Sequence, residues 1–313
     1  MARDRQAVPA VARRGDVWRL GPHLVLCGDA GSAPSVRRVM RGGRAAVVVT
    51  SPPYGAQRQY GGAPQGGWDG LMRRVFRAAE AGVARDTQVL VNLGLVHRAG
   101  EWQPYWDGWT QWMRRRGWRR FGLYAWDQGA GLPGDWNGRL APAFELVFHF
   151  NRQPRRPNKT VPCRYAGKPL LMTGLRRADG SMSGCSHHGR PIQPYRIPDS
   201  VIRVTRHKGR GVEIGHPAVF PVALPEFLMT AYSAPGDVVL DPFAGAGSTL
   251  LAAQRTGRVA RAVELEPGYV DIILARWAAL DGGVEAVREA DGAGYSSLVR
   301  ARDECGDRAN GGL

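Results

Sequence analysis

Residues 235–270 read PGDVVLDPFAGAGSTLLAAQRTGRVARAVELEPGYV, and this stretch decides the fold. Its pattern predicts a strand, a glycine-rich turn, a helix that begins at Leu250, a second strand and then an acidic residue. Gly245 and Gly247 give the turn the backbone freedom that a tight connection and a closely approaching ligand require. A helix that follows such a turn points its first amides back at it. This order predicts a nucleoside site in an α/β sheet.

The chemistry of the ligand is indicated by two carboxylates. Glu264 stands 23 residues after Asp241, at the end of the second strand, where a carboxylate can hold both hydroxyls of a ribose. The alternatives are a solvated strand end, or Glu266 as the ribose ligand. The stretch lacks both the GxxxxGK[ST] motif and the third glycine of GxGxxG. Because an aspartate that opens the turn suits a cationic ligand better than a pyrophosphate, we expect S-adenosylmethionine, which carries sulfonium and ammonium charges.

The rest of the chain alternates between strand-like apolar runs and helix-like stretches. The strand-like runs lie at residues 45–49, 88–93, 144–150, 238–240 and 259–265. Such alternation predicts an α/β fold with a largely parallel sheet that is covered by helices on both faces.

Tryptophans gather between residues 102 and 112 at steps of four, three and three. This spacing predicts a helix that carries Trp102, Trp106, Trp109 and Trp112 on one side. We expect this stripe to pack on the sheet, and a platform for base stacking is the alternative.

Two motifs together resemble a known family. DPFAGAGST, residues 241–249, resembles the cofactor motif DPFxGSGTT of the DNA methyltransferases that modify amino groups, at adenine N6 or cytosine N4. TSPPY, residues 50–54, resembles their catalytic motif (D/N/S)PP(Y/F/W). Residues 216–237 resemble the helix that this family places before its cofactor loop, and the resemblance extends from Gly15 to about Ala279. Ala246 and Ser248 replace the usual serine and threonine.

The order of the motifs is similar to that of the permuted β subgroup, because the catalytic motif comes first and the cofactor motif last. The resemblance implies a Rossmann-like methyltransferase sheet that depends on S-adenosylmethionine. Residues 1–150 would form the first part of the catalytic domain and residues 151–214 a basic target-recognition insert. Residues 215–313 would form the second part of the catalytic domain, with a frayed tail over the last dozen residues.

The catalytic motif has a chemical rationale. The exocyclic amine of a base is a poor nucleophile, and hydrogen-bond acceptors can aim its lone pair at a methyl group. Ser51 Oγ and the Pro52 carbonyl are the expected acceptors, and Pro52 and Pro53 restrict the backbone around them. Tyr54 would stack on a base turned out of the duplex. The alternative for this motif, taken in isolation, is an ordinary strand-terminating turn.

The resemblance also assigns residues to the cofactor site. Asp29 resembles the family position near the adenine, with a turn aspartate as the alternative. His216 is either a cofactor residue or only a helix start. The expected cofactor-binding set is Asp29, Thr50, His216, Asp241, Pro242, Phe243, Ala244, Gly245, Gly247, Ser248, Thr249 and Glu264.

The charge of the chain predicts a polyanionic partner. Lys and Arg number 43 against 27 Asp and Glu, which gives a formal charge of +16. Residues 151–210 hold 14 Lys or Arg and two acids, and we expect a small folded insert there, with disorder as the alternative. Double-stranded DNA is the expected partner, with phosphate contacts from this insert and from RRRGWRR at residues 114–120. The expected DNA-binding residues are Arg155, Arg156, Lys159, Arg176, Arg177, Arg206 and Lys208.

The four cysteines are scattered, which argues against a disulfide framework. A zinc site formed by Cys163, Cys185, His187 and His188 would have unusual spacing, so no metal is expected. The Pro-Cys pair at Pro162 and Cys163 is like that of cytosine C5 methylation, but no strand precedes it. The chain has no signal-peptide core and no membrane-length apolar run, which predicts a cytoplasmic protein.

We therefore expect a site-specific DNA methyltransferase that acts on a flipped base. Ser51 before the two prolines favours cytosine N4, and adenine N6 remains the alternative. An RNA or protein-glutamine methyltransferase is the nearest rival, since related folds use NPPY. A non-catalytic DNA-binding module is another. A homodimer is possible, and the sequence does not tell whether a restriction enzyme accompanies the protein.

Overall fold

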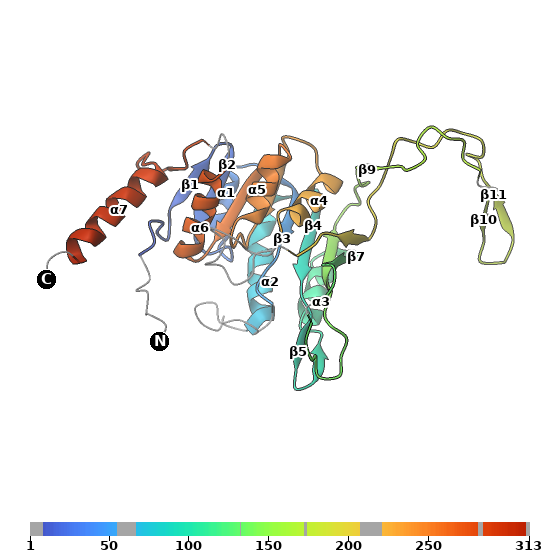
Figure 1. Cartoon of the computed structure of the whole chain (residues 1–313), viewed down its shortest axis with the longest axis horizontal. Coiled ribbons are helices and arrows are strands. Elements are labelled where there is room, and N and C mark those ends of the chain that lie inside the picture. The colour runs from blue at the N-terminus through green and yellow to red at the C-terminus, as the bar shows by residue number, and fades with distance from the viewer. Residues whose placement is uncertain are drawn as a thin grey trace.

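The computed structural model describes residues 9–54, 67–131, 133–171, 174–206, 221–280 and 284–310, and Figure 1 shows their arrangement. Ten strands of this part form one sheet in the order β13-β7-β8-β4-β3-β14-β15-β2-β1-β16. In that order the strands are Val201–Arg203, Arg119–Asp127, Phe144–Asn151, Val83–Leu93, Ala45–Thr50, Val238–Asp241, Val259–Glu264, His23–Cys27, Val17–Leu20 and Val287–Arg288. The sheet contains all five predicted strands.

The centre of the sheet is parallel, as predicted. β4, β3, β14, β15 and β2 all run in one direction. Their valine-rich sequences suit strands that are buried on both faces. Outside this centre the pairing is mixed: β8 runs against β4 and β7, and β1 runs against β2 and β16, whereas the edge strand β13 runs parallel to β7.

Helices cover both faces of the sheet, which confirms the predicted α/β fold. Two separate apolar cores result, one with α4, α5 and α6 and the other with α1, α2 and α3. The described helices are α1 Ala33–Met40, α2 Gly67–Ala79, the 3-10 turn η1 Glu80–Gly82, α3 Asp107–Arg115, α4 Ala223–Tyr232, α5 Ser248–Arg255, α6 Pro267–Ala278 and α7 Tyr295–Asn310.

The tryptophan stripe packs on the sheet, but only part of it is helical. Trp109 and Trp112 lie on α3 and are buried, and Trp106 caps the start of that helix. Trp102 instead lies in β6 (Glu101–Gln103), which pairs with β5 (Val96–Arg98), and it is half exposed. The prediction of one helix through all four tryptophans was therefore wrong for Trp102. Trp102 is part of the β5–β6 hairpin, and its ring contacts that of Trp106.

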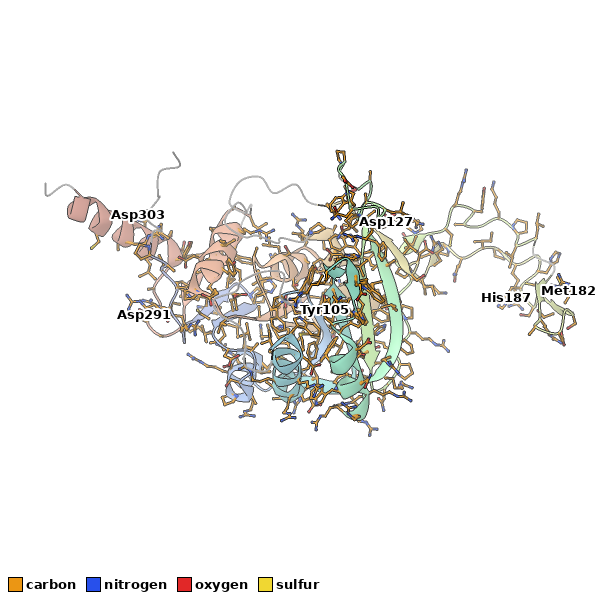
Figure 2. All side chains as sticks on the ribbon, turned by 90° about the horizontal axis from the view of Figure 1, so that it is seen from below. Tyr105, Asp127, Met182, His187, Asp291 and Asp303 are labelled. Atoms are coloured by element: carbon orange, nitrogen blue, oxygen red, sulfur yellow. The ribbon has the colours of Figure 1, made fainter. Side chains whose placement is uncertain are left out.

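The basic insert forms a long arm that projects from the body of the molecule (Figure 1). Two short strand pairs run along it: β9 (Val161–Pro162) with β12 (Tyr195–Arg196), and β10 (Gly174–Arg176) with β11 (Met182–Gly184). Figure 2 places Met182 and His187 at its far end, away from Tyr105 on the body. The apolar side chains expected to form a small core, such as Tyr165 and Leu171, are exposed. The insert is thus ordered by backbone pairing and not by a compact core.

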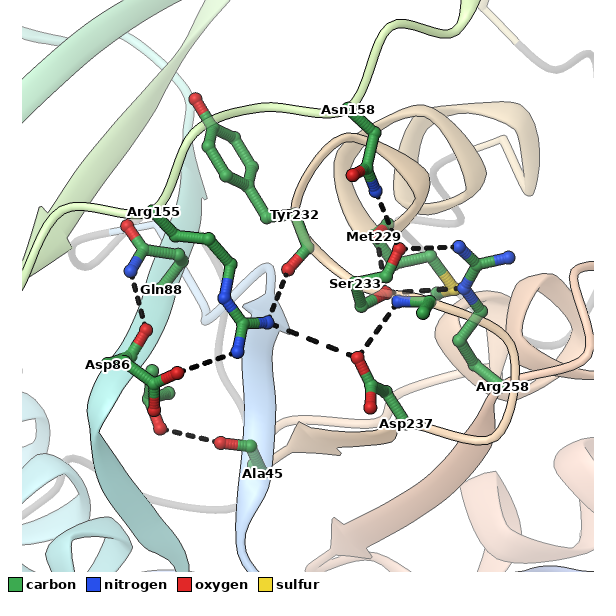
Figure 3. A network of polar contacts seen from close by, with 12 residues as sticks. Ala45, Asp86, Gln88, Arg155, Asn158, Met229, Tyr232, Ser233, Asp237 and Arg258 are labelled. Carbon is green, nitrogen blue, oxygen red and sulfur yellow. Dashed lines mark hydrogen bonds and ion pairs between the residues drawn. The ribbon is translucent and has the colours of Figure 1, made fainter.

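The arm is fastened to the body by Arg155 (Figure 3). The guanidinium binds the Asp86 carboxylate at 2.7 Å and the Tyr232 carbonyl at 2.9 Å, and it lies 4.0 Å from Asp237. Asn158 adds bonds to the last turn of α4, through the carbonyls of Thr230, Ala231 and Ser233. Because Asp86 lies in the first half of β4 and Asp237 precedes β14, this anchor holds the amino-terminal side of the sheet. Two of the guanidinium nitrogens of Arg155 thus have partners within the chain, and a contact of this residue with DNA phosphate stays a prediction.

The segment RRRGWRR lies on the same amino-terminal side. Arg119 pairs with Asn151, at the end of β8 that lies farthest from the carboxyl end of β4. Arg116 and Arg152 both bind Glu80, and Arg152 also stacks on Trp118. Ligands of open α/β sheets bind at the carboxyl ends of the strands. The segment lies away from that edge, and the expectation that it neutralises DNA phosphates stays a prediction.

The C-terminal segment is a helix and not a frayed tail as far as Asn310, because α7 runs from Tyr295 to that residue. Leu298 and Val299 pack its first turns against the core. None of the helices in the described ranges is both long and apolar enough to cross a bilayer.

Replacement of Arg155 by alanine should lower the free energy of unfolding by about 2 kcal/mol, because it leaves Asp86 and the Tyr232 carbonyl without their partner. Urea denaturation measures this loss. The matched control is Arg156→Ala, an exposed neighbour, which should change the same free energy by less than about 0.5 kcal/mol. Equal unfolding free energies for the two variants would contradict the anchoring role.

Candidate active site

The two sequence motifs lie side by side at the carboxyl edge of the sheet. β3 and β14 are adjacent parallel strands, with Val47 opposite Val239 and Val48 opposite Leu240. TSPPY continues from the end of β3, and DPFAGAGST begins at the last residue of β14. The Thr50 hydroxyl donates a hydrogen bond of 2.7 Å to Asp241 Oδ1, and both side chains are buried. A residue of each motif is thus in direct contact, across 191 positions of sequence.

The glycine-rich turn has the backbone shape that its sequence predicts. Gly245 and Gly247 have φ values of 53° and 79°, in the left-handed region. Gly247 directly precedes α5, and a Cβ atom there would lie only 3.0 Å from the Ile273 side chain of α6. Both the conformation and the close packing of α6 therefore require glycine at position 247.

Asp241 is a buried acceptor that is only half satisfied. Its Oδ1 accepts bonds from the Thr50 hydroxyl and from the Phe243 amide at 3.0 Å. Its Oδ2 is buried. The Thr249 hydroxyl lies close to this carboxylate, but neither that hydroxyl nor Oδ2 has a partner at full hydrogen-bonding geometry in the described part of the chain. Burial raises the pKa of Asp241, and the hydroxyls of Thr249 and Thr50 oppose this rise. An unsatisfied carboxylate oxygen beside a glycine turn fits a ligand that carries a hydrogen-bond donor or a positive charge.

Glu264 ends β15 and points at the turn. Its Oε2 accepts a bond from the Gly245 amide at 2.8 Å, and its Oε1 accepts one from the Glu266 amide at 2.9 Å. Burial raises the pKa of Glu264 to about 7, against the two amide bonds that lower it. Glu266 instead turns toward Arg14 on the outside, so the geometry favours Glu264 over Glu266 as the candidate ribose ligand.

The other expected cofactor residues that the structure describes lie in this turn or directly beside it. Ala244 and Thr249 are buried beside it, and Ala244 donates its amide to the Val263 carbonyl. The Ser248 hydroxyl accepts a bond from Arg276. Pro242 and Phe243 complete the turn itself. His216 lies outside the described residues.

Asp29 follows β2, the neighbour of β15, so it lies at the same edge of the sheet. One carboxylate oxygen caps the Gly31 amide at 2.8 Å, and the other forms an ion pair with Arg74. Asp29 therefore acts as a turn aspartate, which was the alternative to a cofactor role. Both of its carboxylate oxygens already have partners within the chain.

The catalytic motif meets two polar residues that the sequence did not single out. The Tyr54 hydroxyl lies 3.1 Å from Ser51 Oγ and donates to Glu145 Oε2 at 2.7 Å. Asn92 Nδ2 donates to both the Tyr54 hydroxyl and Glu145 Oε2, at 2.8 and 2.6 Å. Asn92 stands one residue before the carboxyl end of β4, and Glu145 is the second residue of the adjacent β8. A polar residue inside each of two apolar runs was the only sign of this pair in the sequence.

Aromatic rings hold the motif in place. The Pro53 carbonyl accepts a bond from Trp68 Nε1 at 2.5 Å, and the ring of Trp68 stands edge-on to that of Tyr105. The Tyr54 ring lies over Gly94, where an added Cβ would approach its carbons to 2.7 Å. One side of the expected stacking ring is therefore covered by the backbone of Gly94.

The expected DNA-binding residues do not form one cluster. Arg156, Lys159, Arg176 and Arg177 are exposed along the arm. Arg206 lies near the carboxyl ends of β7 and β13, bound to Gln128 and to the Pro142 carbonyl. Lys208 lies outside the described residues. Among the residues that the structure describes, no group of three His, Cys, Asp or Glu side chains is arranged to hold a metal.

Because the pKa of Glu264 is raised, the free energy of unfolding should depend on pH through this residue. Between pH 4.5, the ordinary pKa, and about pH 7, the folded chain keeps a proton that the unfolded chain has lost. The contribution of this group to stability is therefore present at low pH and is lost as pH rises through that window. Relative to wild type, Glu264→Gln should gain up to about 3 kcal/mol of unfolding free energy from pH 4.5 to pH 8. Urea denaturation at each pH measures the difference.

The control for this series is Glu304→Gln, on the exposed face of α7, whose unfolding free energy should follow wild type at every pH. A difference between Glu264→Gln and wild type that stays constant with pH would show that Glu264 is ionised throughout in the folded chain.

Comparison with known proteins agrees with this geometry. A family model described as DNA methylase matches residues 45–275. The type II methyltransferase M.ScaI of Streptomyces caespitosus is 29% identical over 244 residues, which cover 74% of each chain. The type II methyltransferase M.Cfr9I of Citrobacter freundii is 28% identical over 267 residues, which cover 79% of this chain and 85% of the relative.

Among solved structures, the PvuII DNA methyltransferase, described as cytosine-N4-specific, is similar with a TM-score of 0.59. The sequence identity is 18%, and the match covers 89% of this chain and 90% of that one. This likeness shows a common fold. The family match extends from β3 to α6 and so includes both motifs and the arm between them. The chain therefore belongs to the DNA methylase family, the methyltransferases that use S-adenosylmethionine to modify the N4 or N6 amino groups of DNA bases.

Proposed function

We propose that this DNA methyltransferase is site-specific and that its target is the N4 amine of a cytosine turned out of the duplex. The observation that carries the proposal is the buried bond between Thr50 and Asp241, which joins the catalytic motif to the cofactor turn. A methyl donor bound at the turn would then face an amine bound at Ser51. In-line transfer needs mainly this positioning, since no covalent intermediate with the protein is required.

The residues at the turn fit S-adenosylmethionine. Glu264 would accept bonds from the ribose hydroxyls, because each of its oxygens still has a lone pair beyond the amide that it binds. The unpartnered Oδ2 of Asp241 would accept a bond from a donor or cation of the ligand. When bound, the cofactor supplies an activated methyl group on a sulfonium. The chain supplies the orientation.

The catalytic motif would bind the amine. Ser51 Oγ and the Pro52 carbonyl are the proposed acceptors for its two N–H groups, and the paired prolines hold them in place. Tyr54 would offer the ring face that Gly94 leaves open to the flipped base. Pro53, held by Trp68, keeps this loop from relaxing away from the strand end.

Cytosine N4 is proposed over adenine N6 because a serine stands before the two prolines. Members of the family with aspartate at this place tend toward adenine, and this chain has the neutral Ser51. The choice rests on this one residue.

The arm is the proposed contact for the surrounding DNA. Arg176 and Arg177 are exposed at its β10–β11 end, and Arg156 and Lys159 are exposed nearer its base. Exposed cations along a projecting ribbon can neutralise phosphates over a distance that a compact surface would not reach. Arg206 is closer to the flipped base than the arm, because it lies at the carboxyl edge of the sheet.

Two substitutions should separate the two halves of the site. Tyr54→Ala should lower the rate of methyl transfer by about 10²-fold, with the dissociation constant for S-adenosylmethionine within about twofold of wild type. Asp241→Asn should raise that dissociation constant by at least about tenfold, because a charged acceptor is lost, and leave salt-dependent DNA binding unchanged. Calorimetry and filter binding measure these constants. If either variant lost both bindings equally, the proposal of two separate subsites would be wrong.

The product identifies the target. DNA incubated with the protein and labelled S-adenosylmethionine, digested to nucleosides and analysed by mass spectrometry, should contain N4-methylcytosine. N6-methyladenine would overturn the assignment of the base. A protein that binds DNA and cofactor but leaves DNA unmethylated would overturn the enzymatic function, and parallel reactions with RNA and with a glutamine peptide would reveal another acceptor.

A further inference from the structure

A carboxylate without a cationic partner stands behind the catalytic motif. Glu145 forms no ion pair within the described residues, although it is half buried. Its neighbours are the Tyr54 hydroxyl, the Asn92 amide and the ring of Tyr105, whose hydroxyl binds the Gly94 carbonyl. Removing a carboxylate from water costs free energy, and a chain that needed only packing here would carry an apolar residue. The position of Glu145 therefore calls for a role in the chemistry of the site.

The hydrogen bonds of this group have a definite direction. The Tyr54 hydroxyl donates to Glu145 Oε2 at 2.7 Å. Burial and the nearby Glu145 raise the pKa of Tyr54, so the phenol keeps its proton and stays a donor. With that proton committed, the Tyr54 oxygen accepts from Asn92 Nδ2 and from Ser51 Oγ.

Among the residues that the structure describes, this order leaves lone pairs of Ser51 Oγ without a donor. The Ser51 hydroxyl directs its proton toward Tyr54, 3.1 Å away, so its oxygen is open on the other side as an acceptor. An exocyclic amine needs such an acceptor, because only an acceptor pulls its lone pair out of the ring. If Ser51 pointed its proton at the amine instead, it would hold the lone pair and block the attack.

We propose that Glu145 is a positioning residue for methyl transfer, which fixes the direction of the chain Ser51–Tyr54–Glu145 and receives the proton that the amine releases. This proposal rests on the function proposed above and adds a residue to it.

Methyl transfer to the amine is followed by transfer of one proton to Glu145. The amine nitrogen forms a bond to the methyl carbon, the carbon–sulfur bond breaks, and its electron pair stays on sulfur. The nitrogen, now positively charged, gives a proton to Ser51 Oγ, Ser51 gives its own proton to Tyr54, and Tyr54 gives its proton to Glu145 Oε2. The carboxylate becomes a neutral acid, the charge on nitrogen is removed, and no oxidant or second reactant is needed. The acid returns its proton to water after the product leaves.

The negative charge also helps before the proton moves. Positive charge develops on the amine nitrogen during the attack, and a carboxylate reached through two hydroxyls stabilises it. The ring of Tyr105 packs against Trp68, and its hydroxyl binds the Gly94 carbonyl beside Tyr54, so this side of the path is lined by rings.

The test compares wild type with Glu145→Gln, whose amide oxygen can still accept from Tyr54 but cannot take up a proton. The readout is the rate of methyl transfer in a single turnover at saturating DNA and cofactor. We expect a decrease of about 10²-fold, the usual size of a general-base effect, with KM for DNA and the dissociation constant for S-adenosylmethionine within about twofold of wild type. The matched control is Glu304→Gln on α7, which should transfer methyl groups at the wild-type rate.

A purely structural role is distinguished by a double-mutant cycle. Tyr54→Phe keeps the ring and removes the relay, so it should cost about as much as Glu145→Gln, and the double variant should cost hardly more than either single one. Tyr54→Phe also tests the relay if Glu145→Gln does not fold, which thermal unfolding would reveal.

Three outcomes would count against the proposal. These are a wild-type rate in Glu145→Gln, a wild-type rate in Tyr54→Phe, or multiplying effects of the two substitutions. Failure of this inference is distinguishable from failure of the proposed function, because the latter would appear as absent methyl transfer by the wild-type enzyme.

Discussion

The buried hydrogen bond between Thr50 and Asp241 is the contact on which the site depends. It exists because β3 and β14 are neighbours in the sheet and run in the same direction, so their last residues come to the same height. Everything that follows each strand then starts from one point: two prolines and a tyrosine on one side, a glycine turn and α5 on the other. The register places Asp241 opposite Val49, and Thr50, one residue further on, turns its hydroxyl to the carboxylate where the two strands end.

Much of this could be predicted from the sequence, for physical reasons that particular residues show. Runs such as Val47–Val49 and Val238–Leu240 can only be buried strands, since their branched side chains are apolar on both faces. Gly245 and Gly247 made the turn predictable, because glycine adopts the left-handed backbone angles of this turn at the lowest cost. The apolar runs and the glycine turn together were sufficient to predict the α/β fold. The two motifs were sufficient to predict the family.

What could not be predicted depends on side chains that meet across distant strands. Glu145 and Asn92 look like irregularities in apolar runs until β8 is paired with β4, which brings both side chains to the Tyr54 hydroxyl. Arg155 and Arg116 looked like any other basic residues of a DNA-binding chain, because a composition does not reveal which cations have acids nearby. Trp102 has the spacing of a helical residue in the sequence, but in the structure it lies in the hairpin of β5 and β6.

The arm has two roots in the sheet. Arg155 and Asn158 fasten its first root on the side away from the two motif loops, and its second root joins the sheet as β13 beside β7. If the arm reads DNA as proposed, substitutions between these two roots would change the target sequence without touching the residues around Thr50 and Asp241.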